Sequence, residues 1–243
     1  MNGSKSNAKR RRRGGAPEAP LITAIEPLAS NPNMRKVFVH GKPVVMLRAT
    51  DIESLRIRTG MTWTAEASQR AADAVAANEA RALAMRLLGR RGFARAELIS
   101  RLEQRGCDVS IAERVTAELV RDGWLSDRDR AEAIVRQTTR KGPASRPMLM
   151  AKLTAHGIQS DLASSIADAA RAGRSDLRDA VMLAKHALSA QRSKLPPAAV
   201  ARRIASLLAR RGFDHDTIAS ALERAGLTRD DAESMVEHGV DDS

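Results

Sequence analysis

The chain has 243 residues and a formal net charge of +12, so it is long enough for one or two domains with a buried core. With three Phe, two Trp and no Tyr, that core must be aliphatic, which favours thin helical layers over a β-sandwich. The single cysteine, Cys107, excludes an internal disulfide and a cysteine-cluster zinc site. No apolar run reaches the about 18 residues that a membrane span needs, so we expect a cytoplasmic protein.

Both ends of the chain are biased in charge. Residues 1–19 are rich in Gly, Pro and Ser and carry an arginine run at 10–13, so we expect a disordered basic tail. This tail either improves solubility or contacts phosphates loosely. Residues 228–243 hold six carboxylates against Arg229 alone, and 240–243 form the end of an acidic tail.

Residues 20–77 predict a small β-hairpin followed by helices. The segment His40-Gly41-Lys42-Pro43 separates two short runs of β-branched and apolar residues, which is typical of a hairpin turn. We expect a sheet of two or three strands, a short helix over 51–58 and an Ala-rich helix over 64–77.

From residue 78 the chain repeats itself. Residues 87–93 (Leu-Leu-Gly-Arg-Arg-Gly-Phe) return at 207–213 with one change, and the match over 87–106 has ten identities in twenty positions. A second, weaker repeat has an offset of 51, at which Leu98 and Leu102 correspond to Leu149 and Leu153. Internal repetition of this kind predicts a stack of similar units.

Helix ends are marked by glycines. A helix that ends on glycine in a Schellman motif brings the next residue against the residue five before it, as in Phe93 with Leu88 and Phe213 with Leu208. Six glycines have apolar residues at both required places. They are Gly92, Gly106, Gly123, Gly157, Gly212 and Gly226.

These ends divide the chain into three tandem three-helix repeats, which we expect to form an elongated curved rod. The predicted helices are 79–91, 94–105 and 110–122, then 127–141, 145–156 and 160–172, then 197–211, 214–225 and 229–238. The corresponding repeats span 78–125, 126–173 and 197–239, with a connecting helix within 174–196.

Nothing in the sequence indicates catalysis. The five histidines are scattered without metal-ligand spacing, and the glycines mark helix ends, not phosphate loops. His215, between two aspartates, lies where a helix begins, so a capping role explains that cluster. We therefore expect a non-enzymatic monomer without cofactor or metal.

Cations recur at similar places in the three repeats. Where they lie in a last helical turn, the helix dipole alone explains them. A basic stripe repeated along a rod instead predicts an acidic filamentous or polyanionic partner. The candidate partner-binding residues are Arg86, Arg90, Arg91, Arg95, Arg136, Arg140, Lys141, Arg146, Arg202, Arg203, Arg210 and Arg211.

The order of these motifs resembles the RecX family. The resemblance is carried by the repeated heptad, Glu97–Gly106, Asp122–Asp127, Arg140–Gly142 and His156–Ile158, and it covers about residues 20–240. It implies three three-helix repeats and a regulator that binds RecA or the RecA–DNA filament. Such a regulator mostly inhibits the recombinase, ATPase and coprotease activities of RecA. Two alternatives follow from the residues alone. One is a helical-repeat protein that binds nucleic acid directly, and the other is a structural scaffold for another protein that uses the same concave face.

Overall fold

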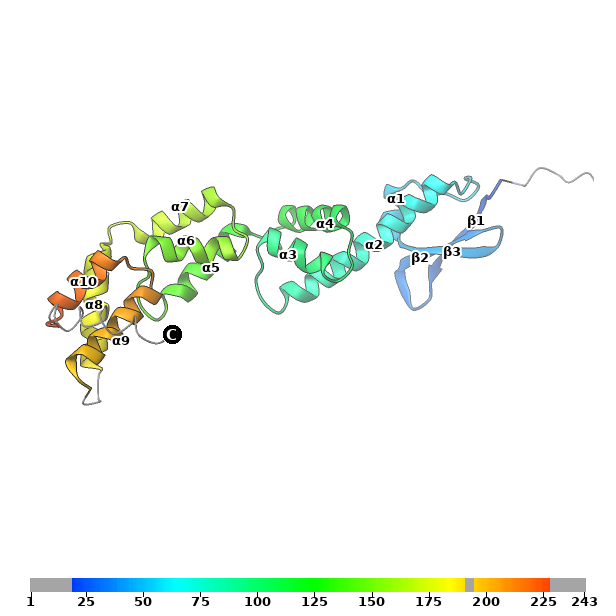
Figure 1. The fold of residues 1–243 in the computed structure, drawn as a ribbon. Helices are drawn as coiled ribbons and strands as arrows, with labels where there is room; N and C mark the ends of the chain where they lie inside the picture. The colour runs from blue at the N-terminus through cyan, green and yellow to red at the C-terminus, as the bar shows by residue number, and fades with distance from the viewer. Residues whose placement is uncertain (1–18, 191–194, 228–243) are drawn as a thin grey trace, which may run out of the picture. The chain divides into compact units, whose positions relative to one another are not determined.

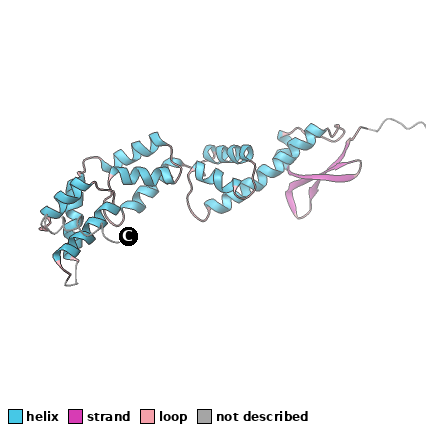
Figure 2. Cartoon of the chain, in the orientation of Figure 1, coloured by secondary structure: helices cyan, strands magenta, loops and turns pink. Residues whose placement is uncertain are grey.

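A computed structural model describes residues 19–190 and 195–227 of the chain (Figure 1). The described part is mainly helical with one three-stranded sheet near its start, which confirms the predicted fold class (Figure 2). The chain divides into two compact units at Ala80/Arg81. No helix in the described ranges is long and apolar enough to cross a membrane.

The first unit begins with an antiparallel sheet in the order β1-β2-β3. The strands are β1 (Ile22–Leu28), β2 (Asn31–Val39) and β3 (Lys42–Arg48). The β2–β3 turn lies at the predicted place, and its residues His40 and Gly41 have φ of 49° and 74°. Two successive positive φ angles are typical of the tight turn whose twist matches that of the strands.

One face of this sheet carries the core of the first unit. Val37 and Leu47 are fully buried and pack in a cluster with Ile57 and Ala71. Ile57 follows α1 (Ala49–Ser54), and Ala71 lies in the first half of α2 (Ala65–Leu88). The hairpin therefore has the helical support that a small sheet needs in water.

The two helices predicted at 64–77 and 79–91 are one continuous helix, α2. The sequence between them, Ala77-Asn78-Glu79-Ala80, contains neither glycine nor proline, so nothing interrupts the backbone hydrogen bonds there. The Asn78 side-chain amide is held by Asp51, to which it donates a hydrogen bond of 2.6 Å.

The second unit consists of successive helical groups. The remaining helices are α3 (Arg95–Glu103), α4 (Val109–Arg121), α5 (Asp127–Thr139), α6 (Arg146–Ala155), α7 (Ser160–Arg171), α8 (Asp176–Ser189), α9 (Pro197–Arg210) and α10 (His215–Arg224). The helix α3 packs on α4, and α5, α6 and α7 pack together around Leu149 and Leu153. Both leucines are essentially inaccessible to solvent.

The helix α8 does more than connect two repeats. It packs against both α9 and α10, and its Ala180, Leu183 and Ala184 share a core with Leu208 and Phe213 (Figure 1). The third group in the described residues therefore consists of α8, α9 and α10, because the apolar side of α8 is buried against α9 and α10. The predicted helix 229–238 and both predicted tails lie outside the described residues.

Five of the six predicted glycine ends have the hydrogen bonds of the Schellman motif. At Gly157, for example, φ is 76°, and the amide of Ile158 donates to the Leu153 carbonyl at 3.1 Å. The equivalent bonds are Cys107 to Leu102, Trp124 to Leu119, Phe213 to Leu208 and Leu227 to Leu222. A side chain is poorly tolerated at each glycine, since its φ is positive.

Gly92 is not a helix end of this kind, so that prediction is wrong. The helix α2 ends at Leu88, and φ of Gly92 is not positive. The reason lies in the single difference between the two heptads, Gly89 in place of Ala209. Glycine is less favourable than alanine inside a helix by about 1 kcal/mol, which favours an earlier end. Phe93 is buried nonetheless, with 4% of its surface exposed.

Candidate acidic-partner interface

Two basic grooves lie on the second unit. The first basic groove lies between the end of α2 and the last turn of α3. It encloses about 340 Å³ and is lined by Leu87, Arg90, Arg91, Phe93, Arg101 and Arg105. Four of its six lining residues are arginines, so an anionic group is the ligand that it suits.

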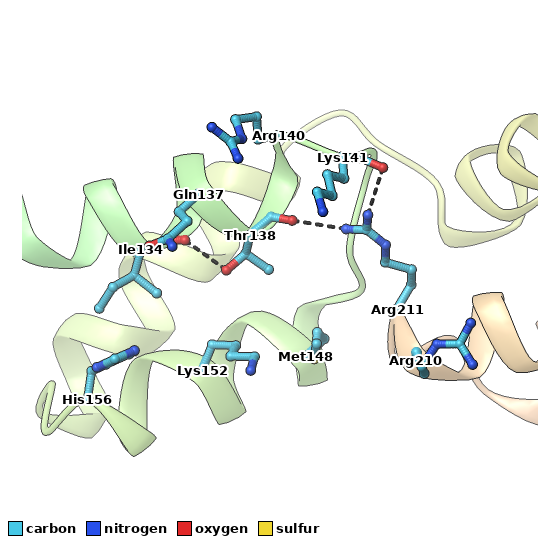
Figure 3. Close-up of a pocket in the computed structure, with 10 residues that line it drawn as sticks. All are labelled: Ile134, Gln137, Thr138, Arg140, Lys141, Met148, Lys152, His156, Arg210 and Arg211. Carbon is cyan, nitrogen blue, oxygen red and sulfur yellow. Dashed lines mark hydrogen bonds between the residues drawn. The ribbon is translucent and has the colours of Figure 1, made fainter.

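The second basic groove lies between the end of α5 and α6, with a contribution from the end of α9 (Figure 3). It encloses about 420 Å³. Its lining residues are Ile134, Gln137, Thr138, Arg140, Lys141, Met148, Lys152, His156, Arg210 and Arg211. Small-molecule pockets of about 300–1,000 Å³ are mostly apolar, whereas cations dominate the polar lining here, so an acidic surface fits better than a cofactor.

The two grooves occupy equivalent places in successive repeats. At the offset of 51, Arg90 corresponds to Lys141 and Arg101 corresponds to Lys152. The same offset relates Arg105 to His156 and Leu87 to Thr138. Four of the six positions that line the first groove therefore also line the second.

Arg91 is held inside its own repeat. Its guanidinium donates hydrogen bonds of 2.6 and 3.2 Å to the Glu97 carboxylate and lies 3.7 Å from the centre of the Phe93 ring. Burial raises the pKa of Glu97, but the hydrogen bond and charge of Arg91 outweigh that effect and lower it. The same carboxylate is 4.0 Å from His156 Nδ1, so Glu97 lies between the two grooves.

Arg211, the counterpart of Arg91, is also held within the chain. Its guanidinium donates to the carbonyl oxygens of Thr138 and Lys141 at 2.9 and 2.7 Å (Figure 3). It also donates to the Gly142 carbonyl at 3.1 Å. These carbonyls lie at the end of α5, where a helix has no internal donors for them. Arg211 therefore shapes a wall of the second groove and joins α9 to the preceding repeat.

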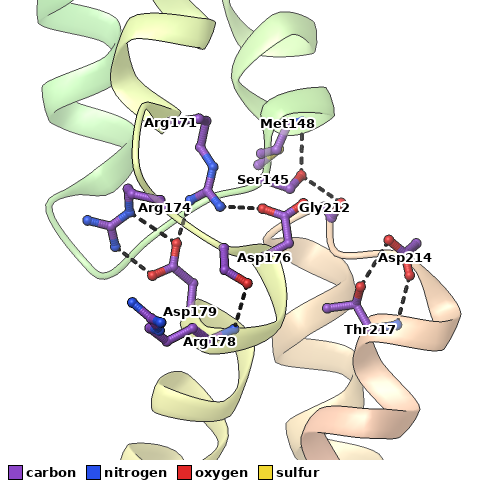
Figure 4. Close-up of polar contacts among 11 residues, drawn as sticks. Ser145, Met148, Arg171, Arg174, Asp176, Arg178, Asp179, Gly212, Asp214 and Thr217 are labelled. Atoms are coloured by element: carbon purple, nitrogen blue, oxygen red, sulfur yellow. Dashed lines mark hydrogen bonds and ion pairs between the residues drawn. The ribbon is translucent and has the colours of Figure 1, made fainter.

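A second contact reinforces this junction between α9 and α6. The Ser145 hydroxyl donates to the Gly212 carbonyl at 2.6 Å and accepts from the Met148 amide at 3.3 Å (Figure 4). Ser145 has 1% of its surface exposed. A Cβ on Gly212 would lie 2.5 Å from the Ser145 hydroxyl, so this approach requires glycine.

The third repeat lacks two of the cations that line the first groove. At the offset of 120, Arg101 and Arg105 correspond to Ala221 and Ala225. Ala221 is fully buried in the core with Leu208 and Phe213. Of the four arginines that line the first groove, the third repeat therefore keeps only the counterparts Arg210 and Arg211, and both of these line the second groove.

The other predicted residues divide into paired and unpaired cations. Arg146 is paired with Asp168 and also donates to Ser164 at 2.8 Å, and Arg136 lies 3.8 Å from Glu132. The hydrogen bond from Arg146 lowers the pKa of Asp168. The remaining predicted cations have no side-chain hydrogen bond or ion pair to described residues. They are Arg86, Arg90, Arg95, Arg140, Lys141, Arg202, Arg203 and Arg210.

Only some of the predicted residues are brought together. Arg86, Arg95, Arg202 and Arg203 are exposed but line neither groove. Lys152 and His156, which do line the second groove, were not singled out from the sequence. The signal that would have found them is the offset of 51, because it aligns them with Arg101 and Arg105.

The comparisons with known proteins agree on one family. A sequence model described as "RecX, first three-helix domain" matches residues 80–119. The chain is 33% identical to "Regulatory protein RecX" of Mycobacterium leprae over 144 residues, which are 58% of this chain and 81% of that protein. It is 34% identical to the protein of the same name from Mycobacterium ulcerans over 135 residues, 56% of this chain and 78% of that one.

Solved structures share the fold. "Crystal structure of regulatory protein RecX" aligns with a TM-score of 0.64 at 16% identity, covering 82% of this chain and 96% of that one. The RecX structure from Lactobacillus salivarius aligns with a TM-score of 0.50 at 18% identity, covering 64% of this chain and 99% of that one. These relatives are named as regulatory proteins. With a repeated helical architecture and this degree of identity over most of the relatives' length, the chain belongs to the RecX family.

Proposed function

We propose that this protein binds RecA or RecA–DNA filaments and mostly inhibits the recombinase, ATPase and coprotease activities of RecA. The observation that supports the proposal is the pair of equivalent basic grooves in a chain of the RecX family. Grooves lined by exposed arginines and lysines suit acidic side chains on a protein surface. The role would belong to homologous recombination, DNA repair and the SOS response in the cytoplasm.

Strand exchange catalysed by RecA tests the proposal directly. We expect the purified full-length chain, added at less than one molecule per RecA subunit, to slow the appearance of exchanged product. A regulator that acts on a filament affects many subunits at once, so sub-stoichiometric action is the diagnostic result. An unchanged rate with equimolar protein in low salt would show that the proposal is wrong.

The second candidate is a protein that binds nucleic acid directly. The observation in its favour is that the same unpaired cations, such as Arg90 and Arg210, would also attract phosphates. Arg91 and Arg211 are unsuitable for separating the two readings, because both hold contacts within the chain. Arg90→Glu with Arg210→Glu is the sharper variant. Loss of DNA binding with unchanged association to DNA-free RecA would favour this second candidate.

A further inference from the structure

We propose that the two basic grooves are two copies of one binding site, and that each receives the same acidic segment from neighbouring subunits of a protein polymer. This inference rests on the proposed function and adds the number, position and chemistry of the contacts. It assigns the first site to Arg90, Arg101 and Arg105, and the second site to Lys141, Lys152 and His156.

The basic residues of the two grooves correspond to one another in sequence. Each residue of one set has its counterpart in the other at the offset of 51, on the equivalent helix end. Exposed cations are often scattered over a helical surface, but a shared position in two grooves requires the same three-residue pattern twice. In the third repeat Ala221 and Ala225 replace two of the cations, and Ala221 is buried in the core, so the exposed basic pair is a feature of the first two repeats and not of every repeat.

The arginines and lysines of the two sites are available to a partner. Arg90, Arg101 and Arg105 form no ion pair with any described carboxylate, and Arg101 donates only to the neutral Gln104 at 3.0 Å. Lys141 and Lys152 likewise make no side-chain hydrogen bond within the described ranges. In contrast, the guanidinium groups of Arg91 and Arg211 donate hydrogen bonds to acceptors within the chain. His156 is the exception among the six assigned residues, because its Nδ1 lies 4.0 Å from the Glu97 carboxylate. Apart from it, each groove separates cations that hold its wall from cations that face a partner.

The lining of the two grooves indicates the class of partner. Each groove combines cations with a partly exposed apolar side chain, Leu87 in the first groove and Met148 in the second. A peptide with alternating acidic and apolar side chains matches both parts of that lining. Single-stranded nucleic acid would use exposed aromatic side chains for base stacking, and Phe93, the one aromatic residue that lines either groove, is buried.

Two like sites on one chain match a partner whose binding segment repeats. Binding at one site places the other near the next copy of that segment, which raises affinity without any new kind of contact. A polymer of identical subunits, such as a RecA filament, presents such a repeat. The two grooves should therefore contribute comparably, and neither should suffice for full affinity.

The experiment is a titration of the labelled full-length chain with preformed RecA filaments on single-stranded DNA. The first-groove variant is Arg101→Glu with Arg105→Glu, and the second-groove variant is Lys141→Glu with Lys152→Glu. We expect each to weaken binding by about 10–100-fold, and the combination of all four changes to abolish it. The matched control is Arg56→Glu with Arg58→Glu, which makes the same change in charge at exposed residues outside both grooves and should weaken binding by less than about 3-fold.

Alanine variants test whether a loss of binding is caused by a loss of folding. Arg101 and Arg105 are both exposed, so Arg101→Ala with Arg105→Ala should leave thermal unfolding nearly unchanged. The two substitutions should still weaken filament binding by about 5–20-fold, because both positively charged side chains have been removed. The same pair of measurements applies to Lys141→Ala with Lys152→Ala.

The outcomes separate this inference from the function on which it rests. If the unaltered chain does not bind filaments, the proposed function itself is wrong. If the chain binds but one groove variant keeps full affinity, or the control loses as much as the groove variants, the two-site inference is wrong and the function stands. Loss of affinity for protein-free DNA alone, with filament binding retained, would make the grooves nucleic-acid sites and would also overturn the inference.

Discussion

At the scale of single residues, the two Arg-Arg pairs divide their work in the same way. The second arginine of each pair is bound internally, Arg91 by Glu97 and Arg211 by three carbonyl oxygens. The first arginine of each pair, Arg90 or Arg210, lines a groove without a described side-chain partner. The sequence does not distinguish the two arginines of a pair. Their roles differ because their side chains leave the helix end in different directions.

This division predicts opposite effects for neighbouring substitutions. Arg211→Ala removes a charged donor from carbonyls at the end of α5, and hydrogen bonds to charged groups contribute about 1.5–3 kcal/mol. We expect the free energy of unfolding to fall by about that amount. Arg210→Ala should change it by less than about 0.5 kcal/mol, since Arg210 is exposed.

Denaturant titration of the two variants measures this difference. Filament binding should show the opposite pattern at Arg210. Arg210→Glu should lose affinity for the filament, while its free energy of unfolding is unaltered. Equal stability of Arg211→Ala and Arg210→Ala would contradict the internal role of Arg211.

At the scale of elements, helix ends determine where the repeats touch. Gly212 ends α9 with φ of 81° and allows the backbone to approach Ser145 and Met148. Gly123 ends α4 with φ of 76°, and nothing lies within 4 Å of the place where its Cβ would be. The same motif thus serves as a simple helix end in one repeat and as a packing surface between repeats in another.

The two glycines provide a matched pair of alanine substitutions. Gly123→Ala should cost about 1–2 kcal/mol of stability, because alanine is strained at positive φ. Gly212→Ala should cost about 1–3 kcal/mol more, because its Cβ would lie 2.6 Å from that of Met148. Thermal or denaturant unfolding measures both values. If the two variants were equally stable, the contact between α9 and α6 would have no energetic importance.

At the scale of the whole second unit, charged contacts connect one helical group to the next. Asp179 at the start of α8 is 6% exposed and accepts from Arg171, at the end of α7, and from Arg174, in the connection (Figure 4). Arg171 also pairs with Asp176. Burial raises the pKa of Asp179, but the hydrogen bonds from Arg174 and Arg171 outweigh it and lower that pKa.

This ionic connection predicts a loss of stability in acid. A carboxyl whose pKa is lowered on folding contributes stability that is complete above its unfolded value, about 3.9 for aspartate. That contribution is lost as the pH falls through the lowered folded value. Asp179→Asn should remove it at every pH, and breaking a buried ion pair costs about 3–5 kcal/mol. Unfolding at pH 7 and pH 3 tests this, because the difference between the unaltered chain and the variant should be smaller at pH 3. The same difference at both pH values would contradict the role assigned to Asp179.

The control for this experiment is Asp168→Asn. Asp168 is also paired with an arginine, Arg146, but both side chains are about half exposed. Exposed ion pairs contribute at most about 1 kcal/mol, so this variant should be nearly as stable as the unaltered chain at pH 7.

The sequence by itself determined those features that depend on neighbouring residues. The hairpin at His40-Gly41 and the helix end at Gly157 each follow from a few adjacent side chains, so local patterns predict them. The same local reasoning placed an end at Gly92. It failed there because Gly89, inside the same turn, had already weakened the helix.

Only the tertiary structure decided which cations share a groove and which are internal. Arg211 meets Thr138 across 73 positions of sequence, and no local pattern records that contact. The same holds for α8, whose apolar side was visible in the sequence but whose partners, α9 and α10, were not. Local propensity specifies where helices begin and end, whereas the pairing of distant surfaces depends on the packing of all of them at once.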